Sequence, residues 1–279
     1  MKNVACIIAR TESKRLPQKA IIDINGLRMI EYIIQKVKKS KLIDEIYVCT
    51  STEESDKVLL DIAKKNGVKS YAGSLNSVID RMLDVAEIEK ADNLIRITGD
   101  NIFTDEVYID LMLNYHLENK VDYTRTEYLP IGLTAEIIKY KALKDCYTLM
   151  DPNYSEYLYL YIFQPSIFKC QVLIPNQKHQ NPNWLLTVDT PQDLERIQAI
   201  VRNSKDLLNY NEIIEACNNN EIPNLEIHFK DNIKLPGGVF LTYDAFVKEK
   251  ENRIQQAMRV EISIDEYNIQ LRKQNENRE

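Results

Sequence analysis

The sequence predicts a doubly wound α/β fold built on a largely parallel sheet. Short apolar runs of strand length alternate with segments of helical periodicity through residues 4–99. With 279 residues, of which 44% are hydrophobic, the chain can bury a large core, as one large domain or as a domain with an appendage. Strands that alternate with helices pair in parallel, and such sheets bind ligands beyond the carboxyl ends of their strands. Functional residues are therefore expected in the segments that follow the strands.

The predicted elements follow one another in a regular order. The strands are VACIIA (4–9), EIYVCTS (45–51), VKSYAG (68–73) and NLIRITG (93–99), and the helices cover 28–40, 55–67 and 77–90. The strands are short apolar or β-branched runs, whereas the helices repeat their apolar residues every three or four positions. Gly67 supplies the stop of the second helix.

Composition and charge exclude several classes of function. The net charge of −6 argues against broad nucleic-acid binding, which usually requires a basic face. No apolar run approaches the roughly 20 residues that span a bilayer, and residues 1–19 lack the order of a signal peptide. We therefore expect a cytoplasmic protein with neither a nucleic acid nor a membrane as partner.

Cysteine spacing and glycine motifs exclude further classes. The five cysteines are scattered, with no CxxC pair and no histidine at metal spacing, so neither a disulfide framework nor a zinc site is expected. They are Cys6, Cys49, Cys146, Cys170 and Cys217. The patterns GxGxxG and GxxxxGK are both absent, which disfavours a dinucleotide enzyme and a P-loop kinase.

A basic segment, ARTESKRLPQKAI (9–21), directly follows the first predicted strand. Its backbone N–H groups, together with Arg10, Arg15 and Lys19, could hold a polyphosphate. Pro17 would stiffen the segment by fixing its own backbone angle. A solvated surface run is the alternative, but the position at the end of a strand favours a binding loop.

This segment and its continuation to residue 51 resemble the opening of the sugar-acid cytidylyltransferases, and most of all the spore-coat polysaccharide branch. The acylneuraminate and 3-deoxy-manno-octulosonate enzymes are more distant relatives. Four later segments resemble further motifs of this family in the family's order: AGSLNSVIDRML, LIRITGDNIFTD, GLTAEIIKYKAL and LLTVDTPQDLERIQAI. The resemblance covers about residues 3–202. It implies a three-layer, mostly parallel nucleotidyltransferase fold of the GT-A/Rossmann-like kind over residues 1–230, followed by a helical extension over 231–279.

The resemblance also implies an activity. Enzymes of this family use CTP and Mg²⁺ to transfer CMP to an acidic sugar with release of pyrophosphate, for cell-surface glycan biosynthesis, and commonly pair as homodimers. Two alternatives remain open at this point. One is a related transferase whose acceptor bears a phosphate or phosphonate. The other is an inactive nucleotide-binding or glycosyltransferase-like protein, although Gly99-Asp100-Asn101 stands where a glycosyltransferase usually shows Asp-x-Asp.

The family motifs assign a role to individual residues. The implied catalytic residues are Arg10, Arg15, Lys19 and Asp100, and the implied metal ligands are Asp100 and Asp189. The implied nucleotide contacts are Ala9, Ser13, Ser74, Asn76, Arg81 and Thr98. The implied acceptor contacts are Glu136, Glu156 and Tyr157. The chemistry suits these types, because Mg²⁺ prefers hard carboxylate oxygens and a flexible ammonium or a rigid guanidinium suits phosphate. Arg81 could instead be a solvated residue of a helix, and Arg96 and Thr98 alternate toward one face of their strand.

Asp189 has a second interpretation. The stretch TVDTPQDLE is typical of a helix start, with Thr190 as the cap, Pro191 at the first helical position and Asp193 in the first turn. Asp193 is therefore assigned a structural role. Asp189 is either a metal ligand or part of this cap.

The acceptor side departs from the family pattern. Relatives of the closest branch have Glu-His-Val-Thr where this chain has SEYLYLYIF, so Tyr157 replaces a histidine, and Ile102 replaces a proline in the earlier strand-end motif. The alternating residues Tyr154, Tyr157, Tyr159 and Tyr161 either place hydroxyls around a sugar or form a half-buried strand. The polar loop with His179 and Gln180 either borders the pocket or is a long connection.

The last part of the chain continues beyond the resemblance. Residues 209–221 indicate a helix, LPGG (235–238) indicates a break, and residues 240–274 indicate one or two amphipathic helices. The expected apolar face comprises Phe240, Tyr243, Phe246, Val247, Ile254, Met258 and Ile262. We expect this face to pack across a dimer or onto the catalytic domain, since such a helix is unstable alone.

Overall fold

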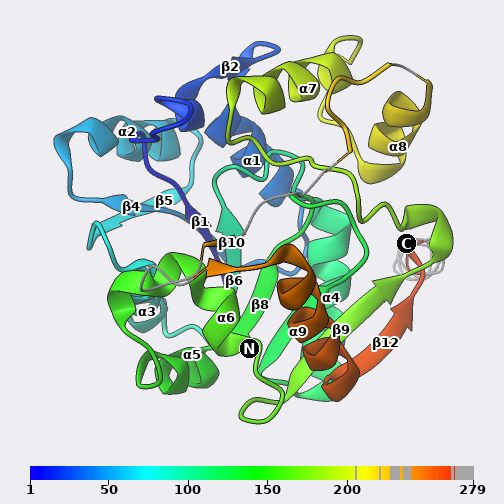
Figure 1. The fold of residues 1–279 in the computed structure, drawn as a ribbon. Coiled ribbons are helices and arrows are strands. Elements are labelled where there is room, and N and C mark those ends of the chain that lie inside the picture. Colours follow the sequence, from blue (N-terminus) through cyan, green and yellow to red (C-terminus); the bar gives the residue numbers. More distant parts are fainter. Residues whose placement is uncertain (205, 220, 227–232, 235–239, 265–266, 268–279) are drawn as a thin grey trace, which may run out of the picture.

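The computed structural model contains one eight-stranded sheet with helices on both faces (Figure 1). The structure describes residues 1–204, 206–219, 221–226, 233–234, 240–264 and 267. The strand order is β12-β9-β7-β8-β6-β1-β4-β5. The strands are β1 (Asn3–Ile8), β4 (Glu45–Ser51), β5 (Lys69–Gly73), β6 (Asn93–Thr98), β7 (Tyr123–Thr126), β8 (Glu136–Lys139), β9 (Cys170–Pro175) and β12 (Met258–Ile262).

All neighbouring strands are parallel except where β8 pairs with β6 and β7. Two two-stranded ribbons accompany the sheet: β2 (Asp23–Ile24) with β3 (Leu27–Arg28), and β10 (Ile233–Lys234) with β11 (Phe240–Leu241). The four strands predicted from the first hundred residues are β1, β4, β5 and β6, which form adjacent positions in the sheet. Their carboxyl ends therefore meet at one edge, where ligands of such sheets bind.

Nine α-helices occur in the part of the chain that the structure describes. They are α1 (Met29–Val37), α2 (Lys57–Lys65), α3 (Val78–Glu89), α4 (Glu106–Asn119), α5 (Tyr140–Tyr147), α6 (Leu158–Ile162), α7 (Pro191–Val201), α8 (Tyr210–Asn219) and α9 (Tyr243–Gln256). Shorter 3-10 helices are η1 (Lys19–Ile21), η2 (Glu54–Asp56), η3 (Pro152–Tyr157) and η4 (Gln177–His179). The predicted helices at 28–40, 55–67, 77–90 and 209–221 are confirmed as α1, α2, α3 and α8.

The sheet separates two apolar cores. Along β1, Ala5 and Ile7 face one core while Val4 and Cys6 face the other, because successive side chains of a strand point to opposite faces. Buried residues of α1, α2, α4, α7 and α8 belong to the first core, and those of α3, α5, α6 and α9 to the second. The three-layer arrangement predicted from the sequence is confirmed.

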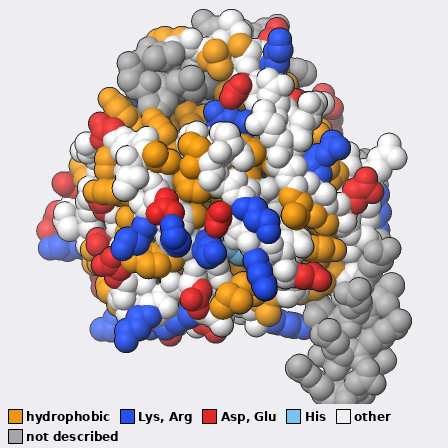
Figure 2. Space-filling view, turned by 90° about the horizontal axis from the view of Figure 1, so that it is seen from below, with side chains coloured by type: hydrophobic (Ala, Val, Ile, Leu, Met, Phe, Trp, Pro, Cys, Tyr) orange, Lys and Arg blue, Asp and Glu red, His pale blue; other side chains and the backbone are white. Residues whose placement is uncertain are grey.

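The cysteines lie in the interior, and the surface carries charges of both signs. All five cysteines are free and buried. Among the residues described, no helix is both long enough and apolar enough to cross a bilayer. The face shown in Figure 2 carries Lys and Arg side chains interspersed with Asp and Glu.

The extension is partly helical and partly strand. The predicted helix exists as α9, but it ends at Gln256, and Met258 and Ile262 lie in β12, so their assignment to a helix was wrong. The segment MRVEI pairs in parallel with β9 over its whole length, and this pairing overrides the helical spacing of its apolar residues. Phe240 lies in β11 and is exposed rather than on the helix face. The LPGG break lies outside the described residues.

The extension packs onto the main sheet. Ile254 of α9 is buried in the second core, and Ile262 of β12 is buried in the first. The sequence predicted that the extension packs across a dimer or onto the catalytic domain. Within this chain it packs onto the sheet of the preceding domain. The domain boundary near residue 230 stays a prediction.

Candidate active site

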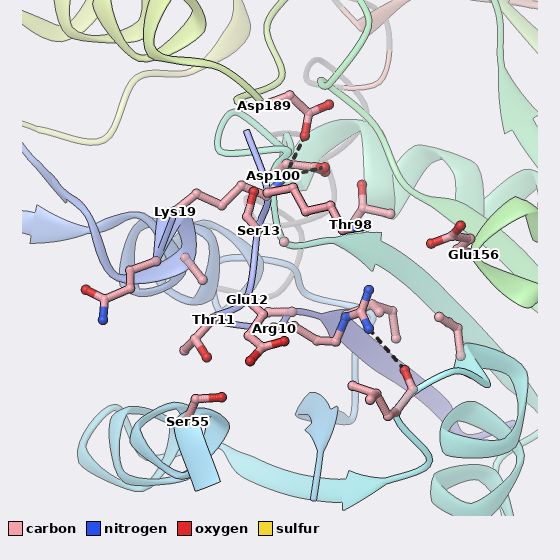
Figure 3. Close-up of a pocket in the computed structure, with 18 of the residues that line it drawn as sticks. Arg10, Thr11, Glu12, Ser13, Lys19, Ser55, Thr98, Asp100, Glu156 and Asp189 are labelled. Carbon is pink, nitrogen blue, oxygen red and sulfur yellow. Dashed lines mark hydrogen bonds and ion pairs between the residues drawn. The ribbon is translucent and has the colours of Figure 1, made fainter. Parts of the chain in front are cut away.

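A cavity of about 1230 Å³ opens at the carboxyl ends of β1 and β6 (Figure 3). Its lining includes most of the residues predicted from the sequence: Ala9, Arg10, Ser13, Arg15, Lys19, Asn76, Arg81, Thr98, Asp100, Glu156 and Asp189. Ser74, Glu136 and Tyr157 are not part of the lining. The basic segment 10–19 forms one side of this cavity, as its position after the first strand predicted.

Gly99 allows the ends of β1 and β6 to approach closely. Its N–H donates to the carbonyl of Ile8 at 2.7 Å, and a Cβ at this position would lie 2.8 Å from that oxygen and from the Cβ of Ala9. Any side chain here would push the two strand ends apart. Glycine at 99 therefore brings Asp100 beside the start of the basic loop.

Asp189 is brought to the same place by the backbone of its neighbour. The N–H of Val188 donates to the carbonyl of Asp100 at 3.0 Å. The following helix, α7, is capped by Thr190, whose hydroxyl accepts from the N–H of Asp193, while the Asp193 carboxylate accepts from the N–H of Thr190. The cap predicted from Thr190, Pro191 and Asp193 is confirmed. Asp189 takes part in this cap through its backbone N–H, which donates to Oδ2 of Asp193 at 3.0 Å, whereas its side chain faces the pocket.

Lys19 joins the two aspartates. Its ammonium lies 2.6 Å from Oδ1 of Asp189 and 3.1 Å from Oδ2 of Asp100, and it also donates to the carbonyl of Val188 at 3.2 Å. Burial disfavours the charged ammonium, but the two carboxylates outweigh it and raise the pKa of Lys19 above its ordinary value of 10.5. Arg15 adds a second cation, 3.1 Å from Oδ2 of Asp189. Lys19 thus stays charged and holds two carboxylates together.

The basic loop has a fixed base and an exposed tip. The N–H of Gln18 donates to the carbonyl of Thr11 at 3.0 Å, which closes the loop, and Leu16 is buried in the first core. The side chain of Arg15 is 66% exposed, so it is free to bind a ligand in the pocket. The loop is anchored by backbone and apolar contacts and presents Arg15 at its exposed tip.

Asp56 anchors the start of this loop and was not identified from the sequence. Its Oδ1 accepts from both the N–H and the hydroxyl of Thr11 at 2.7 Å, and its Oδ2 accepts from the N–H and the hydroxyl of Ser51. Burial opposes the charge of this carboxylate, but these hydrogen bonds outweigh it and lower the pKa of Asp56 below 3.8. In the sequence Asp56 looks like an ordinary residue of a helix start, and no local signal connects it to Thr11.

The pocket is also lined by a buried arginine. Arg81 of α3 is 1% exposed, its NH1 donates to the carbonyl of Cys49 at 3.3 Å, and its Nε has no hydrogen-bond partner among the described residues. Burial lowers the pKa of Arg81. The alternative of a solvated helix residue was wrong. Arg81 therefore brings a guanidinium to the pocket lining from α3.

Asn76 and Ser74 lie in one short segment but have different positions relative to the pocket. Asn76 lines the pocket, whereas the hydroxyl of Ser74 accepts from the N–H of Ser77 at 3.1 Å just before α3. Arg10 reaches across to this segment and donates to the carbonyl of Leu75 at 3.3 Å (Figure 3). Ser74 therefore shapes the turn rather than the cavity.

The predicted acceptor residues also differ in their positions relative to the pocket. Glu156 lines the pocket, whereas Glu136 lies behind it and binds the guanidinium of Arg96 and the hydroxyl of Tyr123. Burial opposes the charge of Glu136, but Arg96 and the hydroxyl outweigh it and lower the pKa of Glu136. Arg96 itself lines the pocket and donates to the carbonyl of Glu156 at 3.2 Å. Glu136 thus holds Arg96 rather than forming part of the cavity surface.

The structure decides between two pairs of alternatives on this side. The tyrosine-rich segment is helical, in η3 and α6, so the half-buried strand was wrong, because Leu158, Ile162 and Phe163 pack together in the second core. His179 does not line the pocket. It is buried, where its Nδ1 lies 2.9 Å from the hydroxyl of Tyr108 and its carbonyl accepts from the hydroxyl of Tyr210 at 2.8 Å. Its loop is therefore a packed connection.

The two aspartates fit a hard divalent cation. Their carboxylates converge within reach of one ammonium and stay partly exposed, at 25% for Asp100 and 30% for Asp189. Over the described ranges, no group of three or more His, Cys, Asp or Glu side chains could hold a metal by itself. A cation bound here would need further oxygens from a ligand. This suits Mg²⁺, which is commonly held by one or two carboxylates and completed by phosphate oxygens and water.

Comparisons with known proteins agree with this geometry. A model of the family described as cytidylyltransferase matches residues 4–221. The spore coat polysaccharide biosynthesis protein SpsF of Bacillus subtilis is 30% identical over 230 residues, which are 79% of this chain and 96% of that protein. The 3-deoxy-manno-octulosonate cytidylyltransferase of Chloroherpeton thalassium is 32% identical over 121 residues, 43% of this chain and 48% of that protein. A solved cytidylyltransferase from Leptospira borgpetersenii is 28% identical with a TM-score of 0.76, covering 82% of this chain and 100% of the other.

Proposed function

Because the chain belongs to the cytidylyltransferase family, and so is a CTP-dependent nucleotidyltransferase, we propose that it transfers CMP from CTP to an acidic sugar and releases pyrophosphate. The observation that carries this proposal is the cluster of Lys19, Asp100 and Asp189 at the base of the basic loop. An oxygen of the acceptor attacks the α-phosphorus, and the bond from that phosphorus to the pyrophosphate oxygen breaks. Negative charge must be neutralised on both sides of that phosphorus, and this cluster lies where the strand ends place a ligand.

The donor nucleotide takes the side of the pocket between the basic loop and α3. The triphosphate is proposed to bind Arg10, Arg15 and Lys19, which bring positive charge from one loop. The cytidine is proposed to lie toward Asn76 and Arg81, with Ala9, Ser13 and Thr98 also lining its site. The guanidinium of Arg81 supports this assignment, since it lines the pocket and guanidinium N–H groups can donate to oxygens of the base or ribose.

Asp100 and Asp189 are the residues that would hold Mg²⁺. The bound cation would act as a Lewis acid on phosphate oxygens and orient them. The chain's own contribution is to place the two carboxylates side by side, which it does through Gly99 and the hydrogen bond from Val188 to Asp100. Lys19 balances their charge and keeps them within the pocket.

The acceptor takes the remaining side of the cavity. We define the acceptor wall as Asn153 and Glu156 of η3, which line the pocket together with Arg96. A sugar offers hydroxyls that suit an amide and a carboxylate, and the carboxylate of an acidic sugar suits nearby cations. The names of the two curated relatives, which concern a spore coat polysaccharide and 3-deoxy-manno-octulosonate, support a sugar acid as the acceptor class.

A nucleotide and acceptor panel tests this function. CTP, ATP, GTP and UTP are each incubated with Mg²⁺ and with acidic sugars, beginning with 3-deoxy-manno-octulosonate, and with phosphorylated alcohols as the competing class. Pyrophosphate release that requires both CTP and an acidic sugar is the expected result. Release that requires a phosphorylated alcohol would replace the acceptor class. No release with any pair, in a protein that binds CTP, would refute the enzymatic proposal.

A further inference from the structure

The C-terminal extension lies outside the family match at 4–221, yet one of its helices contacts the segment that carries the acceptor wall. This helix, α9, lies on the same face of the sheet as α6 (Figure 1). The η3 helix, which contains Asn153 and Glu156, runs directly into α6. A contact at α6 can therefore affect the acceptor side of the pocket.

The position of α9 is fixed by the strand that follows it. β12 pairs in parallel with β9 from Met258 opposite Gln171 to Ile262 opposite Pro175. Ile254 of α9 is 1% exposed and belongs to the same apolar core as Leu158 and Ile162 of α6. The helix is thus held on the sheet and packed against α6.

Arg253 of α9 binds the end of α6. Its NH1 donates to the carbonyl of Leu160 at 2.9 Å and to that of Phe163 at 3.1 Å. The last carbonyls of a helix lack partners within the helix and favour a nearby cation, and a helix of five residues is not stable alone. Glu249 orients the guanidinium through an ion pair of 3.0 Å. Arg253 therefore stabilises the conformation and position of α6.

A second contact links α9 to the same helix from another direction. Lys250 pairs with the buried Glu127 at 3.3 Å, and Glu127 also pairs with Arg125 at 2.8 Å. The guanidinium of Arg125 lies 4.4 Å from the ring centroid of Tyr159 in α6, a favourable cation–π distance. Lys250 thus supports α6 indirectly, through two intervening side chains.

The other end of the wall is held by the catalytic core. The N–H of Ile79 in α3 donates to the hydroxyl of Ser155 at 3.1 Å, and Arg96 donates to the carbonyl of Glu156 at 3.2 Å. The segment 152–163 is thus fixed by the core at its beginning and by α9 at its end.

We propose that the C-terminal extension positions the acceptor wall, with Arg253 as the positioning residue, so that this extension governs use of the acceptor while CTP binding is independent of it. The proposal rests on the assignment of η3 to the acceptor side. None of the donor-side residues contacts Arg253, Lys250 or Ile254 through any hydrogen bond or ion pair found among the described residues. The two sides of one pocket would then depend on different parts of the chain.

Three variants of the full chain test this proposal. Arg253→Ala removes both hydrogen bonds, Arg253→Lys keeps the charge, and Lys248→Ala removes an exposed cation from the same helix as the matched control. Hydrogen–deuterium exchange of the backbone amides of 153–163 is measured without ligand, CTP affinity by calorimetry, and acceptor KM and kcat with the acidic sugar that the panel identifies. We expect Arg253→Ala to raise exchange in 153–163 and to raise the acceptor KM by roughly tenfold, the effect of losing about 1.5 kcal/mol of charged hydrogen bonding. The CTP affinity of Arg253→Ala should equal that of the unaltered protein. Arg253→Lys should show a smaller rise in exchange and in acceptor KM than Arg253→Ala. Lys248→Ala should behave as the unaltered protein.

The possible outcomes separate this proposal from the proposed activity. Unchanged exchange in 153–163, or a fall in CTP affinity equal to the rise in acceptor KM, would overturn the positioning role. If Arg253→Ala does not fold, the same measurements are made on Lys250→Ala, which is a milder change. Unchanged exchange of residues 153–163 in Lys250→Ala would then also overturn the positioning role. If exchange rises as expected but the unaltered protein turns over no acidic sugar, the positioning of the wall stands and the proposed acceptor fails.

Discussion

The phosphate end of the pocket and the acceptor wall are built in different ways. At the phosphate end, Asp100 follows the end of β6 through Gly99, and the backbone hydrogen bond from Val188 to Asp100 brings Asp189 beside it. The proposed acceptor wall lies on a 3-10 helix whose Glu156 carbonyl accepts from Arg96, and the α6 helix that follows it is held by Arg253. The comparison indicates that the phosphate end is built from the sheet framework, whereas the proposed acceptor wall depends on side-chain contacts from distant segments.

The largest effect is expected from Asp100→Asn. The change removes a hard anionic oxygen with almost no change of shape, and we expect turnover to fall by about a hundredfold or more, the range seen when one electrostatic contact to a reacting group is lost. Pyrophosphate release measures the effect, and circular dichroism checks the fold. Glu12→Gln, an exposed carboxylate of the same pocket, serves as the control. Near-normal turnover in Asp100→Asn would contradict the proposal that the phosphates bind beside Asp100.

The next effect concerns the cations that face these carboxylates. Lys19→Met keeps the apolar stem but removes the ammonium, and Arg15→Ala removes the exposed guanidinium. Each loses a charged hydrogen bond of about 1.5–3 kcal/mol, so CTP binding should weaken by tenfold or more. Calorimetric titration with CTP measures this. We expect the larger loss for Lys19, which touches both aspartates. Equal affinity in both variants and the unaltered protein would contradict the donor assignment.

A smaller and more selective effect is expected from Glu136→Gln. This residue holds Arg96 from behind the pocket, so its loss should move Arg96 and the carbonyl of Glu156 that it binds. We expect acceptor KM to rise about fivefold, the effect of about 1 kcal/mol at the low end of the cost of an unsatisfied buried partner, with CTP affinity retained. Steady-state kinetics at saturating CTP measure it. A parallel loss of CTP affinity would show that the two sides of the pocket are not independent.

The smallest effect on turnover is expected from Asp56→Asn, which tests whether the donor side also depends on a distant side chain. Asp56 anchors Thr11, and the change should cost about 1–3 kcal/mol of stability at neutral pH because buried donors lose an ionised acceptor. The lowered pKa of Asp56 fixes the sign of the pH dependence: its stabilisation is present above pH 3.8 and is lost as the pH falls through the folded-state pKa.

Denaturant unfolding of the two proteins between neutral pH and pH 3 measures this difference. The gap between the unaltered protein and Asp56→Asn should be widest at neutral pH and should close in the acidic range. A gap that stays constant over the whole range would mean that the charge of Asp56 is not what holds the loop.

Much of the donor side was predictable because it depends on short-range signals. Apolar runs located β1, β4, β5 and β6, and the order of strands and helices predicted residues 9–20 and 98–104 beyond the carboxyl ends of the strands. The Thr190–Asp193 pair predicted a capping box that the structure contains. Ordered family motifs added the identity of the fold and the enzyme class, which composition alone could not supply.

The residues whose position or role the sequence did not predict share one property, which is that this position or role depends on a partner far away in the chain. Ser74, Glu136 and Tyr157 were predicted in the pocket, but which face of a turn or helix meets the cavity depends on how α3, β8 and η3 pack. The importance of Asp56 arises from Thr11, which a different strand brings to it. Sequence spacing carries no information about such partners.

By itself, the sequence determined the alternation of strands and helices, the basic loop after the first strand, the start of α7 and the family, because backbone preferences and apolar periodicity act over a few residues. Only the tertiary structure decided that MRVEI (258–262) is an edge strand rather than a helix, that the side chain of Asp189 faces Lys19, and that Arg253 binds the end of α6. The physical reason is the same in each case. A strand needs a neighbour with free backbone groups, and a buried charge needs a partner, and both are supplied by segments that meet only when the sheet has formed.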